Sequence, residues 1–354
     1  MEYKKLGDYC NITSSKRIFA EQYVSEGIPF YRSKEIIEKN NNQNISEPLF
    51  ISKETYETIK EKFGVPKEND ILLTSVGTLG IPYIVKNETF YFKDGNLTWL
   101  KDFKKELNQK YLYYWLSSKF GYKSLTLRAI GSSQPALTID ILKKYKLFIP
   151  PLPTQQKIAS ILSAYDNLIQ NYKKQIEALQ TAASELYKEW FVRFRFPGCQ
   201  TTRFENGIPK GWKVEKLGNL ANISTGKCNR EDAEENGIYP LFDRSQEIKK
   251  SNEWIKDCEA IIVPGEGTSF IPRYYKGKFN LHQRCYCVEP KYPDFGKFLF
   301  YVLMLNRKYF LSVATGATVP SLRYNNFASM KFVLPEMSLC NNFNKIADRY
   351  FCES

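Results

Sequence analysis

Histidine is almost absent from this 354-residue chain, which contains a single residue of that type, His282. Its eight cysteines are scattered, and no Cys-x-x-Cys pair occurs. A zinc site needs several histidine or cysteine ligands at short spacing, and a disulfide framework needs cysteines at a higher density. We therefore expect no metal site, and free thiols in a reducing cytoplasm.

Long apolar runs are missing as well. No stretch of 18 residues is apolar enough to cross a membrane, and the opening MEYKKLGDY does not have the pattern of a signal peptide. We therefore expect a cytoplasmic protein that neither enters a membrane nor is secreted. The length suits two or three domains, each able to bury its own core.

Signatures of catalysis are also lacking. The Asn/Asp-Pro-Pro-Tyr/Phe signature of adenine methyltransferases does not occur. A phosphate-binding loop is not formed either, because Gly226-Lys227 is followed by Cys228 and Ala221 stands where the first glycine belongs. A serine–histidine–aspartate arrangement would depend on His282 alone. The sequence therefore predicts no catalytic residue on this chain.

Positive charge and aromatic residues are abundant. The chain has 51 Lys and Arg against 38 Asp and Glu, a formal net charge of +13, and 15% of its residues are aromatic. Such an excess of positive charge favours a polyanionic partner, either a nucleic acid or an anionic membrane surface.

The chain repeats itself once. Four anchor segments of the first half return in the same order in the second: LGDYCNI (6–12) as LGNLANI (217–223), SVGTLGIP (75–82) as PGEGTSFIP (264–272), GSSQPALT (131–138) as GATVPSLR (316–323), and LFIP (147–150) as FVLP (332–335). A period near 200 residues is far too long for a solenoid or a propeller blade. The repeat therefore predicts two whole domains of one type.

Each domain is expected to mix strands and helices, which gives an α/β (α+β) class. Short β-rich runs broken by glycine and proline predict strands at 70–77, 81–85, 89–92, 259–265 and 279–289. Apolar periodicity predicts helices at 110–120 and 295–310.

A heptad series lies between the two copies. It consists of Ile158, Leu162, Tyr165, Ile169, Tyr172, Ile176, Leu179, Ala183, Leu186 and Trp190. Spacings that alternate between four and three over more than four heptads predict a coiled-coil helix. The expected domains are 1–153 and 197–338, with a spacer helix at 154–196 and a second, short helix at 339–354.

These features together resemble the DNA-specificity subunit of type I restriction–modification systems. The strongest match is PPLPTQQKIASILSAYDNLI (150–169) followed by ELYKEWFVRFRFP (185–197), which is similar to that family's central helix. The paired openings KKLGDYCNI and EKLGNLANI, the glycine turns, GKFNLHQRCYCV (277–288) and the segments GSSQPALT and GATVPSL support it. The resemblance covers the whole chain.

The resemblance implies a non-catalytic subunit with two target-recognition domains, each of which reads half of a split DNA site. It implies that two methyltransferase subunits dock on the helices and modify adenine with S-adenosylmethionine, and that a motor–nuclease subunit joins for ATP- and Mg-driven restriction. No cofactor is expected on this chain itself. The docking face is expected at Ile158, Leu162, Tyr165, Ile169, Tyr172, Ile176, Leu179, Leu186 and Trp190.

The second conserved helix is short in this sequence. We expect this to leave the heptad series uncovered from Ile176 to Trp190, which would favour self-association. Trp190 with its neighbouring phenylalanines is expected to form an adhesive patch for a methyltransferase. Two alternatives remain open: a truncated or silent copy of a specificity subunit, or the specificity-determining part of a methyltransferase with unrecognised catalytic residues.

Candidate DNA contacts lie in paired loops of the two copies. Arginine and glutamine pair bidentately with guanine and adenine, and the backbone of a glycine turn can approach phosphate. The candidates are Arg32, Ser33, Gly77, Thr78, Arg128, Ser132, Ser133, Gln134, Lys227, Arg230, Arg244, Gly267, Thr268, Gln283, Arg284, Thr315, Thr318 and Arg323. Plain hairpin turns and solvated loops are the alternatives for these segments, and the lysines can serve only to neutralise phosphates. His282, with Gln283 and Arg284 on an expected strand, is either a core residue or a base reader.

Overall fold

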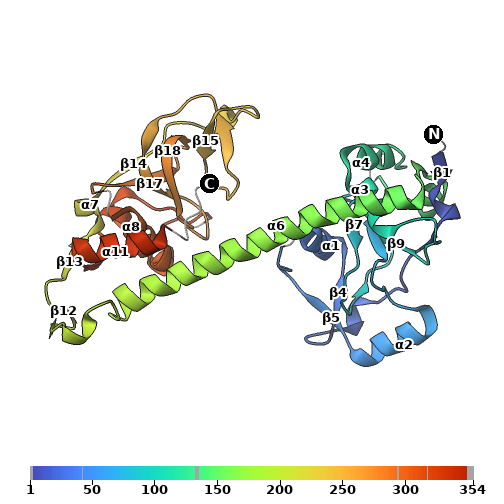
Figure 1. The fold of residues 1–354 in the computed structure, drawn as a ribbon, viewed down its shortest axis with the longest axis horizontal. Coiled ribbons are helices and arrows are strands. Elements are labelled where there is room, and N and C mark those ends of the chain that lie inside the picture. Colours follow the sequence, from blue (N-terminus) through green and yellow to red (C-terminus); the bar gives the residue numbers. More distant parts are fainter. Residues whose placement is uncertain (1–2, 42, 132–134, 293–294, 317, 349–354) are drawn as a thin grey trace. The chain divides into compact units, whose positions relative to one another are not determined.

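The computed structural model describes residues 3–41, 43–131, 135–292, 295–316 and 318–348. The chain divides into two compact units, Met1–Gln170 and Asn171–Ser354. Each unit combines sheets with short helices, and the long helix α6 (Leu152–Tyr187) begins in the first unit and ends in the second (Figure 1). This confirms the predicted α/β (α+β) class, with two domains and a long helix between them.

Two four-stranded sheets make up most of the first unit. One has the order β2-β9-β6-β7 and is antiparallel throughout; the other has the order β3-β5-β4-β8, with β4 and β8 parallel. Their strands are β2 (Asn11–Thr13), β3 (Tyr23–Val24), β4 (Ile28–Tyr31), β5 (Leu49–Ile51), β6 (Ile71–Thr74), β7 (Pro82–Ile84), β8 (Tyr91–Phe92) and β9 (Leu97–Lys101). A separate antiparallel pair, β1 (Tyr3–Lys5) and β10 (Lys146–Phe148), brings the two ends of this domain together.

Both faces of the sheet that contains β6 are covered. Ile71 and Leu73 belong to one hydrophobic cluster and Leu72 to another, as expected for a strand whose successive side chains point to opposite faces. The helices that supply the covering side chains and the connections are α1 (Ser33–Asn40), α2 (Lys53–Phe63), α3 (Gln109–Ser117), α4 (Lys119–Thr126) and α5 (Ile139–Lys144).

In the second unit the corresponding strands form one six-stranded sheet. Its order is β14-β19-β17-β18-β15-β16, and β15 runs parallel to β18 as β4 does to β8. The strands are β14 (Ala221–Thr225), β15 (Tyr239–Phe242), β16 (Lys249–Ser251), β17 (Lys256–Pro264), β18 (Arg273–Leu281) and β19 (Cys285–Pro290). Two further pairs join β11 (Phe204–Glu205) to β12 (Ile208–Pro209) and β13 (Lys213–Lys216) to β20 (Lys331–Leu334).

Helices of the second unit pack on this sheet and on the end of α6. They are α7 (Leu217–Leu220), α8 (Gly296–Leu305), α9 (Arg307–Val313), α10 (Tyr324–Ala328) and α11 (Met337–Ala347). Six residues of α8 are buried, and together with the other helices they enclose a core rich in phenylalanine and tyrosine.

Three expected elements differ from the structure. The helix expected at 110–120 is divided at Ser118, whose extended backbone ends α3 and whose hydroxyl oxygen accepts a hydrogen bond from the N–H of Gly121 to begin α4. The helix expected at 295–310 is likewise divided at Asn306. The strand expected at 279–289 is two strands, β18 and β19, joined by a tight turn that places Gln283 and Arg284 outside the ladder.

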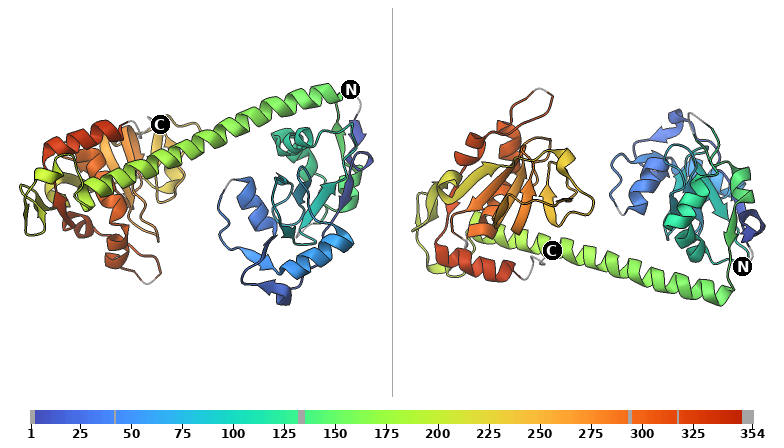
Figure 2. Two further views of the ribbon diagram at one scale, coloured as in Figure 1. Left: turned by 60° about the horizontal axis from the view of Figure 1, so that its bottom comes forward. Right: turned by 90° about the horizontal axis from the view of Figure 1, so that it is seen from above.

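The last turns of α6 are part of the second unit's core. Helix α11 runs beside them (Figures 1 and 2), and the ring of its fully buried Phe343 contacts the rings of Tyr187, Trp190 and Phe191. After Tyr187 the helix continues as a π-helical turn, Lys188–Val192. The expectation that the heptad series is uncovered as far as Trp190 was therefore wrong, because Phe343 of α11 covers that end.

Candidate DNA interface

The glycine turn and the loop before the helix, which the repeat singled out, lie side by side in both units. In the first unit the N–H of Leu137 donates to the carbonyl oxygen of Ser75 at 2.9 Å, and Val76 forms an isolated antiparallel β-bridge with Ala136. In the second unit the N–H of Leu322 donates to the carbonyl oxygen of Gly265 at 2.8 Å. Glu266 bridges to Ser321 in the same way. The two domains therefore present equivalent turns on equivalent frameworks.

An open pocket of about 250 Å³ lies beside this turn in the second unit. Four segments form it: the short helical turn at Arg230–Asp232, the residues after β15, the turn after β17, and the start of the turn between β18 and β19. The lining residues are Arg230, Asp243, Arg244, Ser245, Glu266, Gly267 and His282. Three of the predicted contact residues, Arg230, Arg244 and Gly267, are thus brought together.

Glu266 binds two of the predicted arginines at once. Its Oε2 accepts a hydrogen bond from Nη1 of Arg244 at 2.7 Å, and its Oε1 accepts one from Nη1 of Arg284. The carboxylate side chain is 15% exposed, whereas the arginine side chains are 45% and 56% exposed. Both guanidinium groups therefore face solvent while their shared acid is largely covered.

His282 lies in the same pocket in a fixed tautomer. Its Nδ1 accepts a hydrogen bond from the backbone N–H of Arg284 at 3.0 Å, so in the neutral ring the proton is on Nε2. Burial, and then the positive charges of Arg244 and Arg284, lower the pKa of His282. A neutral imidazole that can donate from Nε2 is the result.

A second network fixes the backbone that carries Arg244. Although burial opposes its ionisation, hydrogen bonds from Ser245 and Lys249 hold the pKa of Asp243 at about 2. Arg273 donates to the carbonyl oxygens of Asp243 and Ser245, the latter at 2.8 Å. The segment on both sides of Arg244 is thus held in place, while the Arg244 side chain remains exposed.

The equivalent arginine of the first unit has a different environment. Arg32 directly follows β4, and Arg244 comes shortly after β15. The guanidinium group of Arg32, however, binds Glu35, which is fully buried on α1. The backbone N–H of Arg32 also donates to Glu35 at 2.7 Å, which completes the start of that helix. Ser33 donates to the carbonyl oxygen of Asn96. These contacts serve the fold, and the predicted DNA contact of Arg32 stays a prediction.

Several other predicted contact residues are at the surface. Gly77, with a φ of 78°, has nothing within 4 Å of its Cβ position, so backbone of a ligand can approach it closely. Arg128 lies over the ring of Tyr145 at 5.7 Å from its centroid and is exposed. Exposed as well are Thr78, Lys227, Thr268, Gln283, Thr315, Thr318 and Arg323. The remaining candidates, Ser132, Ser133 and Gln134, lie outside the described residues.

Sequence reasoning missed the acidic members of this interface. Glu266 and Asp243 adjoin predicted contact residues in the sequence, but a search for groups that attract phosphate overlooks carboxylates. Asn229 was missed as well, and its Oδ1 accepts a hydrogen bond from Gln283 at 2.7 Å. The sequence signal that could have identified Glu266 is its position directly before Gly267, in a turn that the repeat identifies.

Helix α6 presents an apolar face between its two buried ends. Its first turns are anchored in the first unit by Gln155, a fully buried amide that donates to the carbonyl oxygens of Glu106 and Pro150 and accepts from the N–H of Asn108. Its last turns are buried in the second unit. Between them Leu162, Tyr165, Ile169, Tyr172 and Ile176 are 38–62% exposed.

Of the other residues of the expected docking face, Ile158, Leu179 and Leu186 are half-buried and Trp190 is buried. Trp190 is therefore not part of an exposed adhesive patch.

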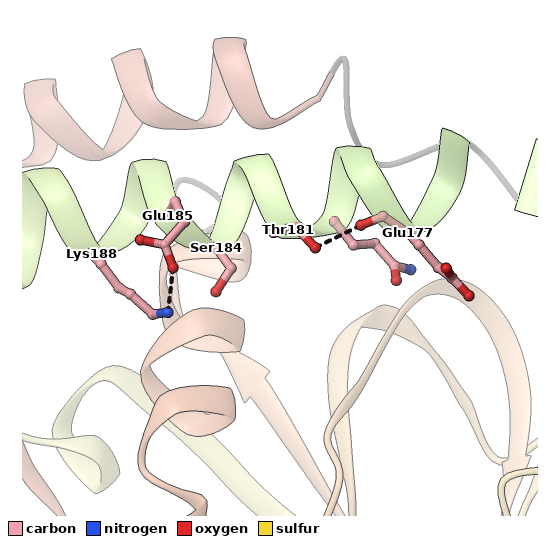
Figure 3. A pocket seen from close by; sticks show the side chains of 6 residues that line it. Glu177, Thr181, Ser184, Glu185 and Lys188 are labelled. Carbon is pink, nitrogen blue, oxygen red and sulfur yellow. Dashed lines mark hydrogen bonds and ion pairs between the residues drawn. The ribbon is translucent and has the colours of Figure 1, made fainter. Parts of the chain in front are cut away.

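A polar hollow also runs along the end of α6, and its lining residues belong to this helix and to the π-helical turn that continues it (Figure 3). Two pairs of near neighbours are bonded there: the hydroxyl of Thr181 donates to the carbonyl oxygen of Glu177 at 2.8 Å, and Lys188 binds Glu185 at 2.6 Å. Such i to i+3 and i to i+4 pairs are typical of a solvated helix surface.

Metal-binding clusters and membrane-spanning helices are both absent from the described residues. Among them, no group of three or more histidine, cysteine or acidic side chains is arranged to hold a metal ion. No described helix combines the length and the apolar character needed to span a bilayer.

Two domains with equivalent loop frameworks and a long amphipathic helix between them define the architecture. The chain belongs to the family described as the type I restriction modification DNA specificity domain, whose model matches residues 1–181 and 209–341. This confirms the family that the sequence motifs indicated.

Two relatives are similar over long segments. The type I restriction enzyme MjaIX specificity subunit of Methanocaldococcus jannaschii is 26% identical over 323 residues, which cover 79% of this chain and 70% of that protein. A Haemophilus influenzae protein assigned as a type I restriction enzyme specificity subunit is 32% identical over 195 residues, 54% of this chain. The chain spans about half the length of this second relative, since the match covers 47% of it.

The fold is similar to that of a type I restriction-modification system S subunit from M. genitalium. The TM-score is 0.63 at 18% sequence identity, and the match covers 99% of this chain and 88% of that chain. At this identity the comparison supports the architecture alone.

Proposed function

We propose that this chain is a sequence-specific DNA-binding subunit that reads a bipartite site, one half with each domain, and delivers partner methyltransferase subunits to it. The observation that carries the proposal is the repeated pairing of a glycine turn with a polar loop, in both units of a chain that belongs to the specificity family. The role is non-catalytic, and S-adenosylmethionine, ATP and magnesium belong to the partners.

Charge supports the choice of DNA as the ligand. A chain with a net charge of +13 releases several counterions when it neutralises phosphates, so its DNA affinity should fall steeply as salt increases. The exposed Lys227, Arg230 and Arg323 are suited to phosphate contact, whereas Arg244 and Arg284 are proposed to reach base edges.

The test is reconstitution with a methyltransferase subunit of a type I restriction–modification system. The purified chain alone should transfer no methyl group, hydrolyse no ATP and cleave no DNA. Together with the methyltransferase subunit it should direct adenine methylation to a split sequence, which sequencing of modified bases would reveal. Methylation by the chain alone, or unchanged methylation when the chain is omitted, would contradict the proposal.

The apolar face of α6 is proposed as the docking site for the methyltransferase subunits. Replacing Tyr165 and Ile169 with lysine should abolish complex formation without unfolding either domain, because both side chains are at least half exposed. Asn167→Lys with Asn171→Lys is the matched control, since it adds the same charge to exposed positions of the helix that lie away from the heptad series. Loss of a self-associated form in place of the heterocomplex would assign the face to a second copy of the chain.

A further inference from the structure

We propose that Glu266, Arg244 and Arg284 form a reader of one guanine–cytosine pair in the second domain. In the free protein Glu266 binds both arginines, and on specific DNA it exchanges one of them for the base pair. The inference rests on the proposed DNA-reading function and assigns a particular ligand to one cluster of residues.

The geometry makes the exchange inexpensive. Each oxygen of Glu266 is bound by one guanidinium group, and both arginine side chains are about half exposed. Exposed ion pairs of this kind contribute little to stability, because solvent screens them. A base edge that offers two acceptors to one guanidinium can therefore displace the carboxylate.

The released groups complement one base pair in the major groove. A guanidinium donates bidentately to O6 and N7 of guanine, and the freed oxygen of Glu266 then accepts from the N4 amino group of the paired cytosine. An adenine–thymine pair does not fit either group. Adenine presents an amino donor to the donating arginine, and thymine presents an acceptor oxygen to the accepting carboxylate. The cluster is thus selective through repulsion as well as attraction.

The free-state pairing also suppresses unspecific binding. Two arginines and one glutamate carry a net charge of +1, so the cluster attracts phosphates less than two unpaired arginines would. The backbone around each group is held in place: the N–H of Gly267 donates to Pro320, the N–H of Arg284 to His282, and Arg273 braces the segment beside Arg244. The side chains can exchange partners while the backbone stays fixed.

The described residues of the first unit do not form this arrangement. Val76 occupies the position of Glu266 in the equivalent bridge, and Lys93, whose N–H binds the strand before Arg32, takes the place of His282. The inference therefore predicts a guanine–cytosine requirement of this kind from the second domain only.

The experiment is selection of bound sequences from a random duplex library by the assembled methyltransferase complex. The wild type should enrich two short elements, one of which contains a fixed guanine–cytosine pair. Glu266→Gln should weaken the preference for that pair about tenfold or more and leave the other element unchanged. The affinity of Glu266→Gln for a random-sequence duplex, measured by fluorescence anisotropy, should rise roughly 5–10-fold. The salt dependence of that affinity should steepen by the equivalent of about one to two additional phosphate contacts.

Glu253→Gln is the matched control, because it removes the same charge from an exposed position of the same unit, outside the cluster, and should change neither quantity. If Glu266→Gln fails to fold, Arg244→Gln and Arg284→Gln test the cluster without altering the carboxylate, and at least one must relax the same pair. An intact preference in all folded variants, or an equal shift in the control, would overturn this inference alone. A wild-type complex that enriches no split sequence would remove the proposed function and this inference with it.

Discussion

Arg32 in the first unit and Arg244 in the second come after equivalent strands. The carboxylates that bind them, however, lie on different structural elements. Glu35, the acid for Arg32, is buried on the helix that the arginine itself begins. Glu266, the acid for Arg244, belongs to a turn that lines an open pocket. The same framework thus supports an arginine that completes a helix in one domain and an exposed arginine in the other. A repeated fold can keep its backbone pairing while the contact residues change independently.

The two units also hold α6 by different means. The first unit uses hydrogen bonds of the buried Gln155, whereas the second encloses the helix end with aromatic rings around Phe343. The corresponding position to Gln155 in the second copy is Cys340, which is buried in the aromatic core. Hydrogen bonds require a particular direction between donor and acceptor, whereas aromatic packing requires that the side chains fill the available volume. The two ends of α6 should therefore respond differently to mutation.

The largest expected effect is at the aromatic end. Phe343→Ala should lower the free energy of unfolding of the second unit by about 3–5 kcal/mol, because it removes a fully buried ring and leaves a cavity beside Tyr187 and Trp190. Chemical denaturation followed by tryptophan fluorescence would measure this change. Met337→Ala on the exposed face of the same helix is the control and should have little effect. Similar losses in the two variants would contradict the assigned packing.

Arg32→Ala should act mainly on stability. It leaves the buried carboxylate of Glu35 without its charged partner, which should lower the free energy of unfolding of the first unit by about 1–3 kcal/mol. The base preferences of the complex should remain as they are in the wild type. A relaxed half-site in a stably folded Arg32→Ala variant would show instead that this arginine reads DNA.

Arg244→Ala should act mainly on recognition. Its side chain is 45% exposed, so stability should change little. Binding to the specific site should weaken by about 1–3 kcal/mol, with relaxed sequence choice in one half-site only. Titrations against specific and random duplexes would separate the possibilities. A uniform loss on all sequences would reassign Arg244 to phosphate contact.

The smallest effect is a pH dependence at Asp243. Its pKa is lowered from 3.8 to about 2 in the folded protein, so the unfolded state binds the proton more readily. The stabilisation from this carboxylate is complete above pH 3.8 and is lost as the pH falls through 2. The stability difference between the wild type and Asp243→Asn should therefore shrink over that interval. A difference that stays constant down to pH 2 would contradict the network around Asp243.

Much of the framework could be predicted from the sequence, because repeats and heptads are local patterns. The paired turns, the long helix and the mixed class all follow from short segments that recur in order. The pairing of Glu266 with Arg244 and Arg284 could not be predicted, since it depends on which strands neighbour each other in the sheet. The covering of Trp190 by Phe343 was missed for a related reason: the heptad pattern shows which side chains seek a partner, but not which distant segment supplies it.

The most direct test of the account is to lengthen the helix between the two domains. Inserting one heptad after Gln175 would extend α6 by about 10 Å at ~1.5 Å per residue. That corresponds to roughly three base pairs at ~3.4 Å each, with a rotation of about a third of a DNA turn. Methylated sites would be mapped for the inserted variant beside the parent. The account predicts unchanged half-sites with a longer gap, or loss of activity where the rotation is not tolerated. Active complexes that keep the parental gap would contradict it.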